Sequence, residues 1–274
     1  MRTTAIFNLK GGVAKTITTA AMADILAIDY GKRVLVIDAD AQGNLSRYFG
    51  VEAQEGCSTL DLLQGTHEAV YSDWVTPARP DTTIDIIPAD MTLMYADVDI
   101  HEGRMTSHHA MEELREAIEQ DAASPDPEAQ EAAYDYMLID CPPSFSAASA
   151  AALVAADDVV IPIRLDAFST SGMADLLAQV ANMRRLNARL KVAGILATQY
   201  QRAPEEREAL TYLRETSGLP VFATQVRYSP RVSAATYARE PLIRFSPMSG
   251  ASVDYRHVVA EYMAQEGGGS NGKA

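Results

Sequence analysis

Lysine, glycine and threonine residues near the start of the chain have the types and spacing of a phosphate-binding loop. Lys10, Gly11 and Gly12 follow a short apolar run, and Lys15 and Thr16 open a helical pattern. Small residues let backbone N–H groups turn inward around an anion, and a helix N-terminus adds partial positive charge. Lys15 would then reach the β- and γ-phosphates of a nucleotide, and the Thr16 hydroxyl would bind Mg²⁺. The residues expected to bind the nucleotide are Lys10, Gly11, Gly12, Val13, Ala14, Lys15, Thr16 and Ile17.

The loop departs from the commonest form of this motif, G-x-x-x-x-G-K-S/T. Leu9 and Ala14 occupy the two glycine positions, and a second lysine, Lys10, stands five residues before Lys15. Alanine suits position 14 only with a negative φ, which we expect here, because side chains disfavour positive φ. The alternative interpretation of the motif is a Gly-Gly turn with a surface lysine.

Aspartates follow two segments that we predict to be buried strands. The run at 33–37 ends in Asp38 and Asp40, and the run at 136–139 ends in Asp140. Continuous apolar runs are typical of strands buried on both faces of a parallel sheet, and such sheets bind ligands at the carboxyl ends of their strands. Four apolar residues before an aspartate also match the layout whose carboxylate holds Mg²⁺. For each aspartate alone, a capping or loop role is the alternative.

Apolar runs alternate with helical patterns along most of the chain, which predicts an α/β fold with a mostly parallel central sheet and helices on both faces. We expect a single domain over 1–266 and a flexible Gly-rich tail over 267–274. An acidic, proline-containing stretch at 121–131 is interpreted as a solvated loop insertion. The other predicted strands lie at 4–7, 84–89, 157–163 and 191–198, and the predicted helices at 20–30, 59–63, 91–102, 107–120 and 169–190.

The charge of the chain is unevenly distributed. The net charge is −14, but residues 1–181 carry 10 Lys/Arg and 29 Asp/Glu, whereas residues 182–274 carry 13 and 8. The two parts therefore differ in sign, −19 against +5, and such asymmetry points to a surface that faces a polyanion.

The cysteines and the length of the apolar runs indicate in which compartment the protein is expected. Cys57 and Cys141 form no C-x-x-C pair, which favours two reduced thiols over a disulfide or a metal site. Without an apolar run of about 18 residues or a leader before the first strand, we expect a cytoplasmic protein rather than a membrane-spanning or secreted one.

Taken together, the motifs resemble those of the ParA/MinD ATPases, which have a deviant Walker A loop. The extra lysine at Lys10 is similar to the signature lysine of that family. D-x-D-x-Q-G-N at 38–44 is similar to its second motif, with Ala41 in place of proline, and I-D-x-P-P-S at 139–144 to its third. The resemblance covers residues 3–264 and implies ATP and Mg²⁺ as cofactors.

The resemblance also implies roles for single residues. Lys10 would reach the phosphates of the partner subunit in an ATP-bound homodimer, and Lys15 would contact those of its own. Asp38 and Asp140, with Thr16, would hold Mg²⁺ and its waters. Asp40 would orient or activate the attacking water, so that Lys10, Lys15 and Asp40 are the catalytic residues.

For DNA, the resemblance implies non-specific binding in the ATP state. By motif position, Arg202 and Arg231 match the arginines with which the family contacts DNA, and Arg227 is a plausible neighbour. A ParB-like activator would stimulate hydrolysis and release the protein from the nucleoid, in the partition of a plasmid, chromosome or other cargo. The alternative for any one arginine is a solvated surface position or an ion pair with a nearby glutamate.

Two other functions stay open at this point. One is a MinD-like positioning ATPase at a membrane, recruited by a partner, because the C-terminal tail carries only one basic residue and direct membrane binding is not expected. The other is a nucleotide-binding scaffold that hardly hydrolyses ATP, which the departures at Ala14, Ile17 and Ala41 suggest. The sequence names neither the cargo nor the activator.

Overall fold

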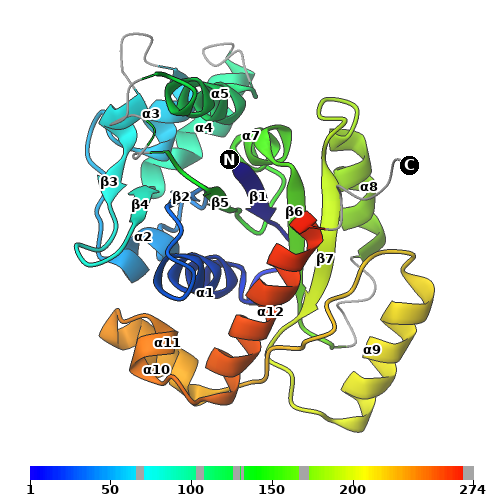
Figure 1. The fold of residues 1–274 in the computed structure, drawn as a ribbon. Coiled ribbons are helices and arrows are strands. Elements are labelled where there is room, and N and C mark those ends of the chain that lie inside the picture. The colour runs from blue at the N-terminus through cyan, green and yellow to red at the C-terminus, as the bar shows by residue number, and fades with distance from the viewer. Residues whose placement is uncertain (66–70, 103–107, 126–129, 131–132, 167–172, 268–274) are drawn as a thin grey trace.

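A seven-stranded sheet forms the centre of the computed structural model, and helices cover both of its faces (Figure 1). The structure describes all residues except 66–70, 103–107, 126–129, 131–132, 167–172 and 268–274. The strand order is β3-β4-β2-β5-β1-β6-β7, and only β3, at one edge, is antiparallel to its neighbour. The strands are β1 (Arg2–Ile6), β2 (Val34–Asp38), β3 (Thr76–Pro77), β4 (Ile84–Ile87), β5 (Tyr136–Asp140), β6 (Asp158–Ile163) and β7 (Lys191–Ala197).

Helices connect successive strands and cover both faces of the sheet, as in other open α/β sheets. Between β1 and β6 these are α1 (Lys15–Ile28), α2 (Asn44–Phe49), α3 (Thr59–Gln64), η1 (Tyr71–Trp74), η2 (Met91–Met94), α4 (Tyr95–His101), α5 (Ala110–Ala122) and α7 (Ala147–Ala155). After β6 they are α8 (Met173–Met183), α9 (Pro204–Thr216), α10 (Pro230–Ala238), α11 (Leu242–Phe245) and α12 (Gly250–Gly267).

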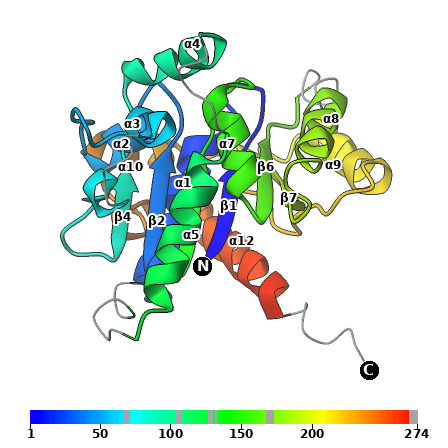
Figure 2. The same ribbon diagram turned by 90° about the horizontal axis from the view of Figure 1, so that it is seen from above.

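The two faces of the sheet bury separate apolar cores. In β2 every residue is buried; Leu35 and Ile37 belong to one core, and Val34 and Val36 to the other, as the period of two along a strand requires. Helices α5 and α7 cover the first face, and α1 and α12 the second (Figures 1 and 2). The predicted α/β fold is thereby confirmed.

The structure corrects several predicted boundaries. Helix α1 begins at Lys15, as the phosphate-loop motif predicted, so the helix predicted at 20–30 was too short at its N-terminal end. Helix α8 ends at Met183 instead of 190, and the antiparallel strand β3 was not predicted. The segment 168–172, the tail from residue 268 and parts of the 121–131 stretch lie outside the described residues, so those expectations stay predictions.

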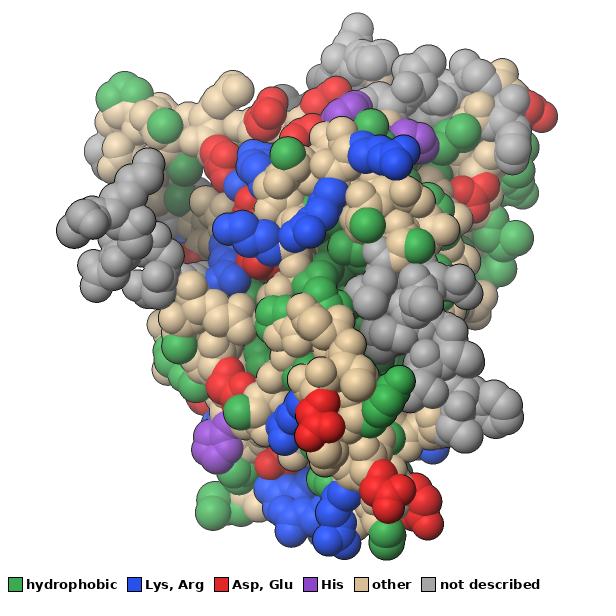
Figure 3. All heavy atoms as spheres, turned by 90° about the vertical axis from the view of Figure 1, so that its right-hand side faces the viewer, with side chains coloured by type: hydrophobic (Ala, Val, Ile, Leu, Met, Phe, Trp, Pro, Cys, Tyr) green, Lys and Arg blue, Asp and Glu red, His purple; other side chains and the backbone are tan. Residues whose placement is uncertain are grey.

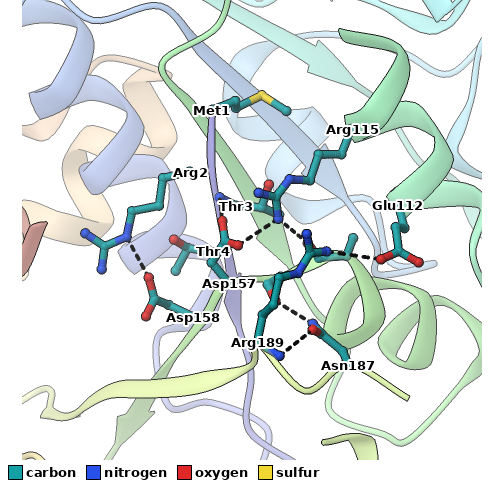
Figure 4. A network of polar contacts seen from close by, with 12 residues as sticks. Met1, Arg2, Thr3, Thr4, Glu112, Arg115, Asp157, Asp158, Asn187 and Arg189 are labelled. Atoms are coloured by element: carbon teal, nitrogen blue, oxygen red, sulfur yellow. Dashed lines mark hydrogen bonds and ion pairs between the residues drawn. The ribbon is translucent and has the colours of Figure 1, made fainter. Parts of the chain in front are cut away.

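A network of charged groups fixes the amino ends of the strands, at the edge opposite to the phosphate loop (Figure 4). The buried Arg115 of α5 donates to Asp157 at 2.8 Å, and Asp157 also accepts from the backbone N–H of Thr3 at 3.0 Å. Arg2 pairs with Asp158 at 2.6 Å. Strand β1, which leads to the phosphate loop, is therefore held against β6 at its start.

A second buried network joins α1 and α2 to the segment that follows α10. The Tyr48 hydroxyl donates to Asp24 at 2.6 Å, and the Arg79 guanidinium lies 3.5 Å from Asp24 and 5.1 Å from the centre of the Tyr48 ring. Arg79 also donates to the carbonyl of Arg239 at 2.8 Å. Burial raises the pKa of Asp24 to about 6, although Arg79 and Tyr48 oppose this shift.

We therefore predict that Asp24 makes stability pH-dependent. The pKa of Asp24 is higher in the folded protein than in the unfolded chain. Its contribution to the free energy of unfolding, about 3 kcal/mol, is therefore fully present below about pH 4 and is lost as the pH rises through about 6. Denaturant unfolding of the wild type and Asp24→Asn between pH 4.5 and 7.5 should show a smaller loss of stability with rising pH in the variant. Glu52→Gln, at an exposed position, is the control, and equal slopes in all three proteins would contradict the prediction.

Candidate functional site

The phosphate loop connects β1 to α1 and curls beneath a buried lysine. Lys15 and Thr16 are the first two residues of α1, and the Lys15 ammonium donates to the carbonyl of Lys10 at 3.1 Å across the loop. Burial lowers the pKa of Lys15, while Asp140 nearby opposes the shift. Gly11 and Gly12 are exposed at the outer turn, as a backbone that receives an anion requires.

The expectation of a negative φ at Ala14 is wrong. Ala14 has φ 65° and ψ 33°, the left-handed conformation, and it stands directly before the first residue of α1. The Thr18 backbone N–H donates to the Ala14 carbonyl at 2.9 Å, so the first turn of the helix fixes this conformation. A side chain in this region costs about 1–2 kcal/mol, and the loop carries that strain at its junction with the helix.

Side chains that directly follow β1 and β7 anchor the loop from below, one of them through a backbone carbonyl of β6. Asn8 donates to the Pro162 carbonyl at 2.8 Å and accepts from the Lys10 backbone N–H at 2.9 Å. The Thr198 hydroxyl donates to the Val13 carbonyl at 3.0 Å, and Gln199 donates to the Gly12 carbonyl at 2.8 Å. None of these anchors was identified from the sequence, because all of their bonds except that between Asn8 and Lys10 join residues 154 or more positions apart.

Two aspartates meet beside the loop because their strands are neighbours. Asp38 ends β2 and Asp140 ends β5, and the two are register partners. Asp38 is fully buried and accepts from the hydroxyl and the backbone N–H of Ser46, at 2.7 and 2.9 Å. Burial raises the pKa of Asp38 to about 6, against these hydrogen bonds. Ser46, at the start of α2, thus positions Asp38, a role that no sequence motif indicated.

Asp140 carries the feature that most clearly suits a cation. Its carboxylate is buried, and among the described residues its Oδ2 atom has no hydrogen-bond partner. Burial and then Asp38 raise the pKa of Asp140, whereas the Thr16 hydroxyl and Lys15 lower it. A buried, partly unsatisfied carboxylate beside a second carboxylate and a threonine hydroxyl fits the oxygen ligands that Mg²⁺ prefers.

Asp40 lies at the rim of the same site. Its backbone N–H donates to Asp38 at 3.2 Å, and its own carboxylate accepts from the Gln42 backbone N–H at 3.0 Å. It is more exposed than Asp38 and Asp140, and it is close enough to act on the charges of Lys15 and Asp140. Its position is compatible with a group that contacts water.

A pocket of about 300 Å³ opens on the other side of the phosphate loop. It joins the loop to the segment after β7 and to the start of α10. Its lining residues are Gly12, Ala14, Ile17, Thr198, Gln199, Val226, Arg227, Tyr228, Ser229, Val232, Ser233 and Tyr255. The site therefore combines a charged end, at the aspartates, with a largely uncharged pocket.

The three arginines predicted to contact DNA lie close to this pocket but differ in their surroundings. Arg202, at φ 65°, and Arg231, in the first turn of α10, are exposed. Their segments are joined, because the Tyr228 backbone N–H donates to the Tyr200 carbonyl at 3.0 Å. Arg227 instead forms a two-pronged ion pair with Asp254, at 2.7 Å for both contacts. The contact of each of the three arginines with DNA stays a prediction, and of the three only Arg227 is held by an ion pair.

Comparison with known proteins decides the family. A family model described as an AAA domain matches residues 1–192. The chromosome partitioning protein ParA of Caulobacter vibrioides is 32% identical over 269 residues, which cover 97% of this chain and 95% of that protein. The chromosome-partitioning ATPase Soj of Thermus thermophilus is 33% identical over 270 residues, which cover 97% and 96%. The chain belongs to the ParA/Soj family of partitioning ATPases.

Solved structures agree with this membership. Cobyrinic acid a,c-diamide synthase of Mycobacterium smegmatis with bound ADP and magnesium has a TM-score of 0.77 at 26% identity, over 98% of this chain and 96% of that one. Apo McdA of Cyanothece, at 22% identity, shares the fold with a TM-score of 0.80 over 96% and 99%. As a ParA/Soj-family protein the chain is an ATPase, with ATP as substrate and Mg²⁺ as cofactor. Within the described residues, no helix combines the length and apolar character of a membrane span.

The left-handed Ala14 leads to a prediction about stability. Ala14→Gly should raise the free energy of unfolding by about 1 kcal/mol, because glycine adopts this conformation without steric cost. Ala23→Gly, inside the same helix, is the matched control and should lower it by about 1 kcal/mol or more. Urea unfolding of both variants tests the pair; a loss of stability in Ala14→Gly would show that Ala14 is not strained.

Proposed function

We propose that this chain is a ParA-type switch, which dimerises with ATP, binds DNA without sequence preference in that state, and leaves DNA after slow hydrolysis stimulated by a ParB-like partner. The observation that carries this proposal is the arrangement of two lysines, Lys10 and Lys15, on one loop beside the buried pair Asp38 and Asp140. Such a site binds a phosphate chain and a divalent cation together, which gives the protein two states that a nucleotide can select.

Each residue of the site has a distinct role in this proposal. The backbone of residues 11–16 and the Lys15 ammonium hold the phosphates at the start of α1. Thr16, Asp38 and Asp140 would hold Mg²⁺, which when bound neutralises charge on the phosphate oxygens. Asp40, at the solvent rim, orients the attacking water. The pocket lined by Ile17, Thr198 and Tyr228 takes the nucleoside, since it lies directly against the loop.

Dimerisation follows from the place of Lys10. The Lys10 side chain is about one-third exposed and pairs with Asp166 at the rim of the loop, where the phosphates of a second subunit can reach it. The transition-state charge on the phosphates is then fully neutralised only in the dimer, which accounts for the low intrinsic turnover that we expect.

DNA binding rests on Arg202 and Arg231. Arg202, which follows β7, and Arg231, in the first turn of α10, are both exposed, and their guanidinium groups form no ion pair within the described part of the chain. On the face that carries α8 and α9, other Lys and Arg side chains lie beside Asp and Glu (Figure 3). The two arginines would therefore supply phosphate contacts on an otherwise acidic protein, and dimerisation doubles their number.

The two lysines should be separable by mutation. Lys15→Ala should abolish ATP binding, because it removes the buried cation from the loop. Lys10→Ala should leave ATP binding measurable but remove ATP-dependent dimerisation. Nucleotide binding followed by calorimetry and dimer formation by analytical ultracentrifugation test this, with Lys32→Ala, far from the loop, as control. Equal dimerisation of the wild type and Lys10→Ala would contradict the proposed role of Lys10 in the dimer.

DNA binding should depend on nucleotide, salt and the two arginines. We expect retention of a non-specific duplex with ATP but not with ADP, weakening steeply as salt rises. Arg202→Ala with Arg231→Ala should lower the slope of log affinity against log salt by about 1 for each lost phosphate contact, with ATPase activity retained. Arg185→Ala, exposed after α8, is the control. Absence of binding in every state would favour a scaffold, or a MinD-like role if the protein floats with lipid vesicles.

A further inference from the structure

The ammonium of Lys10 is bound by a carboxylate of its own chain. It lies 2.7 Å from Oδ1 and 2.8 Å from Oδ2 of Asp166, so the carboxylate grips it with both oxygens. The two side chains are 35% and 32% exposed. Asp166 stands three residues beyond the end of β6 and belongs to none of the sequence motifs.

The backbone around Lys10 is tied to the same strand. Asn8 accepts from the Lys10 N–H at 2.9 Å and donates to the carbonyl of Pro162, in β6, at 2.8 Å. Both ends of Lys10, its backbone and its ammonium, are thus attached to the carboxyl end of β6. A side chain held at both ends loses most of its freedom to extend away from its own subunit.

We propose that Asp166 is a positioning residue for Lys10, which holds the ammonium over its own subunit and must release it before Lys10 can reach the phosphates of a partner. This inference rests on the proposed function, because it assigns a resting place to the lysine that completes the dimer. Asp166 and the partner's triphosphate compete for one cation. ATP-dependent dimerisation is therefore weakened by the free energy of the Lys10–Asp166 contact.

The partial exposure of the pair sets the size of the effect. Ion pairs that water and salt reach are weak, so that the contact is easily exchanged for a polyphosphate. A fully buried ion pair at this place would keep Lys10 on its own subunit, whereas the partly exposed pair that is observed only adds a small free-energy cost to the release of Lys10. The contact thus sets a threshold for dimerisation and does not block it.

The first experiment measures dimerisation with ATP and Mg²⁺ by analytical ultracentrifugation. Asp166→Asn should tighten the dimer by about two- to fivefold, the range of a weak ion pair. Asp166→Glu, which keeps the charge, should behave as the wild type. In the Lys10→Ala background, which should form no ATP-dependent dimer, Asp166→Asn should restore none, because the group that Asp166 holds is absent. An equal or weaker dimer in Asp166→Asn, or the same change without Lys10, would overturn the proposal.

A second measurement tests the contact without a dimer. In the nucleotide-free protein, the rate at which an acetylating reagent modifies the Lys10 amine, followed by mass spectrometry, should rise severalfold in Asp166→Asn. The rate at Lys15, which is buried, should not change and is the internal reference. Equal Lys10 rates in both proteins would refute the contact itself. If the wild type does not dimerise with ATP, the proposed function fails, while this rate still reports on Asp166.

Discussion

The structure depends on two carboxylates that are buried side by side. Asp38 and Asp140 end neighbouring strands in the interior of the sheet, and burial raises the pKa of both, with Asp38 raising the pKa of Asp140 further. Such a pair is stable only if cations or hydrogen bonds compensate it. Lys15, Ser46 and Thr16 supply part of that compensation. The remaining deficit suits this edge of the sheet to a divalent cation and a phosphate chain, as the proposed function requires.

Each partner of the pair is itself connected to another part of the protein. Ser46 belongs to α2, and α2 also carries Tyr48, which binds Asp24 and approaches the segment after α10. On the other side of the phosphate loop, Gln199, which stands three residues before Arg202 in the chain, donates to the Gly12 carbonyl. A change in the loop therefore reaches, through Gln199, the segment that carries Arg202, and a change at Asp38 reaches, through α2, the segment that follows α10. In the proposed function, these contacts connect the nucleotide state to the DNA-contacting surface.

The two lysines of the loop illustrate how burial separates roles. Lys15 is buried within the loop, where its charge acts on Asp140 and Asp40 of its own subunit. Lys10 is held at the rim by Asp166, in a contact that solvent keeps weak. The same residue type thus provides a fixed charge in one place and an exchangeable one in the other. A switch needs both, because a site that binds too tightly in one state cannot be shifted by a ligand.

The sequence by itself determined the α/β fold, the phosphate loop and the aspartates at two strand ends, because these depend on runs of neighbouring residues. Apolar runs predicted strands β2 and β5, and the register then placed Asp38 beside Asp140. Only the tertiary structure decided the conformation of Ala14, which the first turn of α1 imposes, and the edge strand β3, which is two residues long. It alone decided that Asp166 faces Lys10, Ser46 faces Asp38 and Asp254 faces Arg227. Most of these pairings join segments that are distant in the sequence. No pattern of neighbouring residues indicates such a contact, so only the folded structure reveals it.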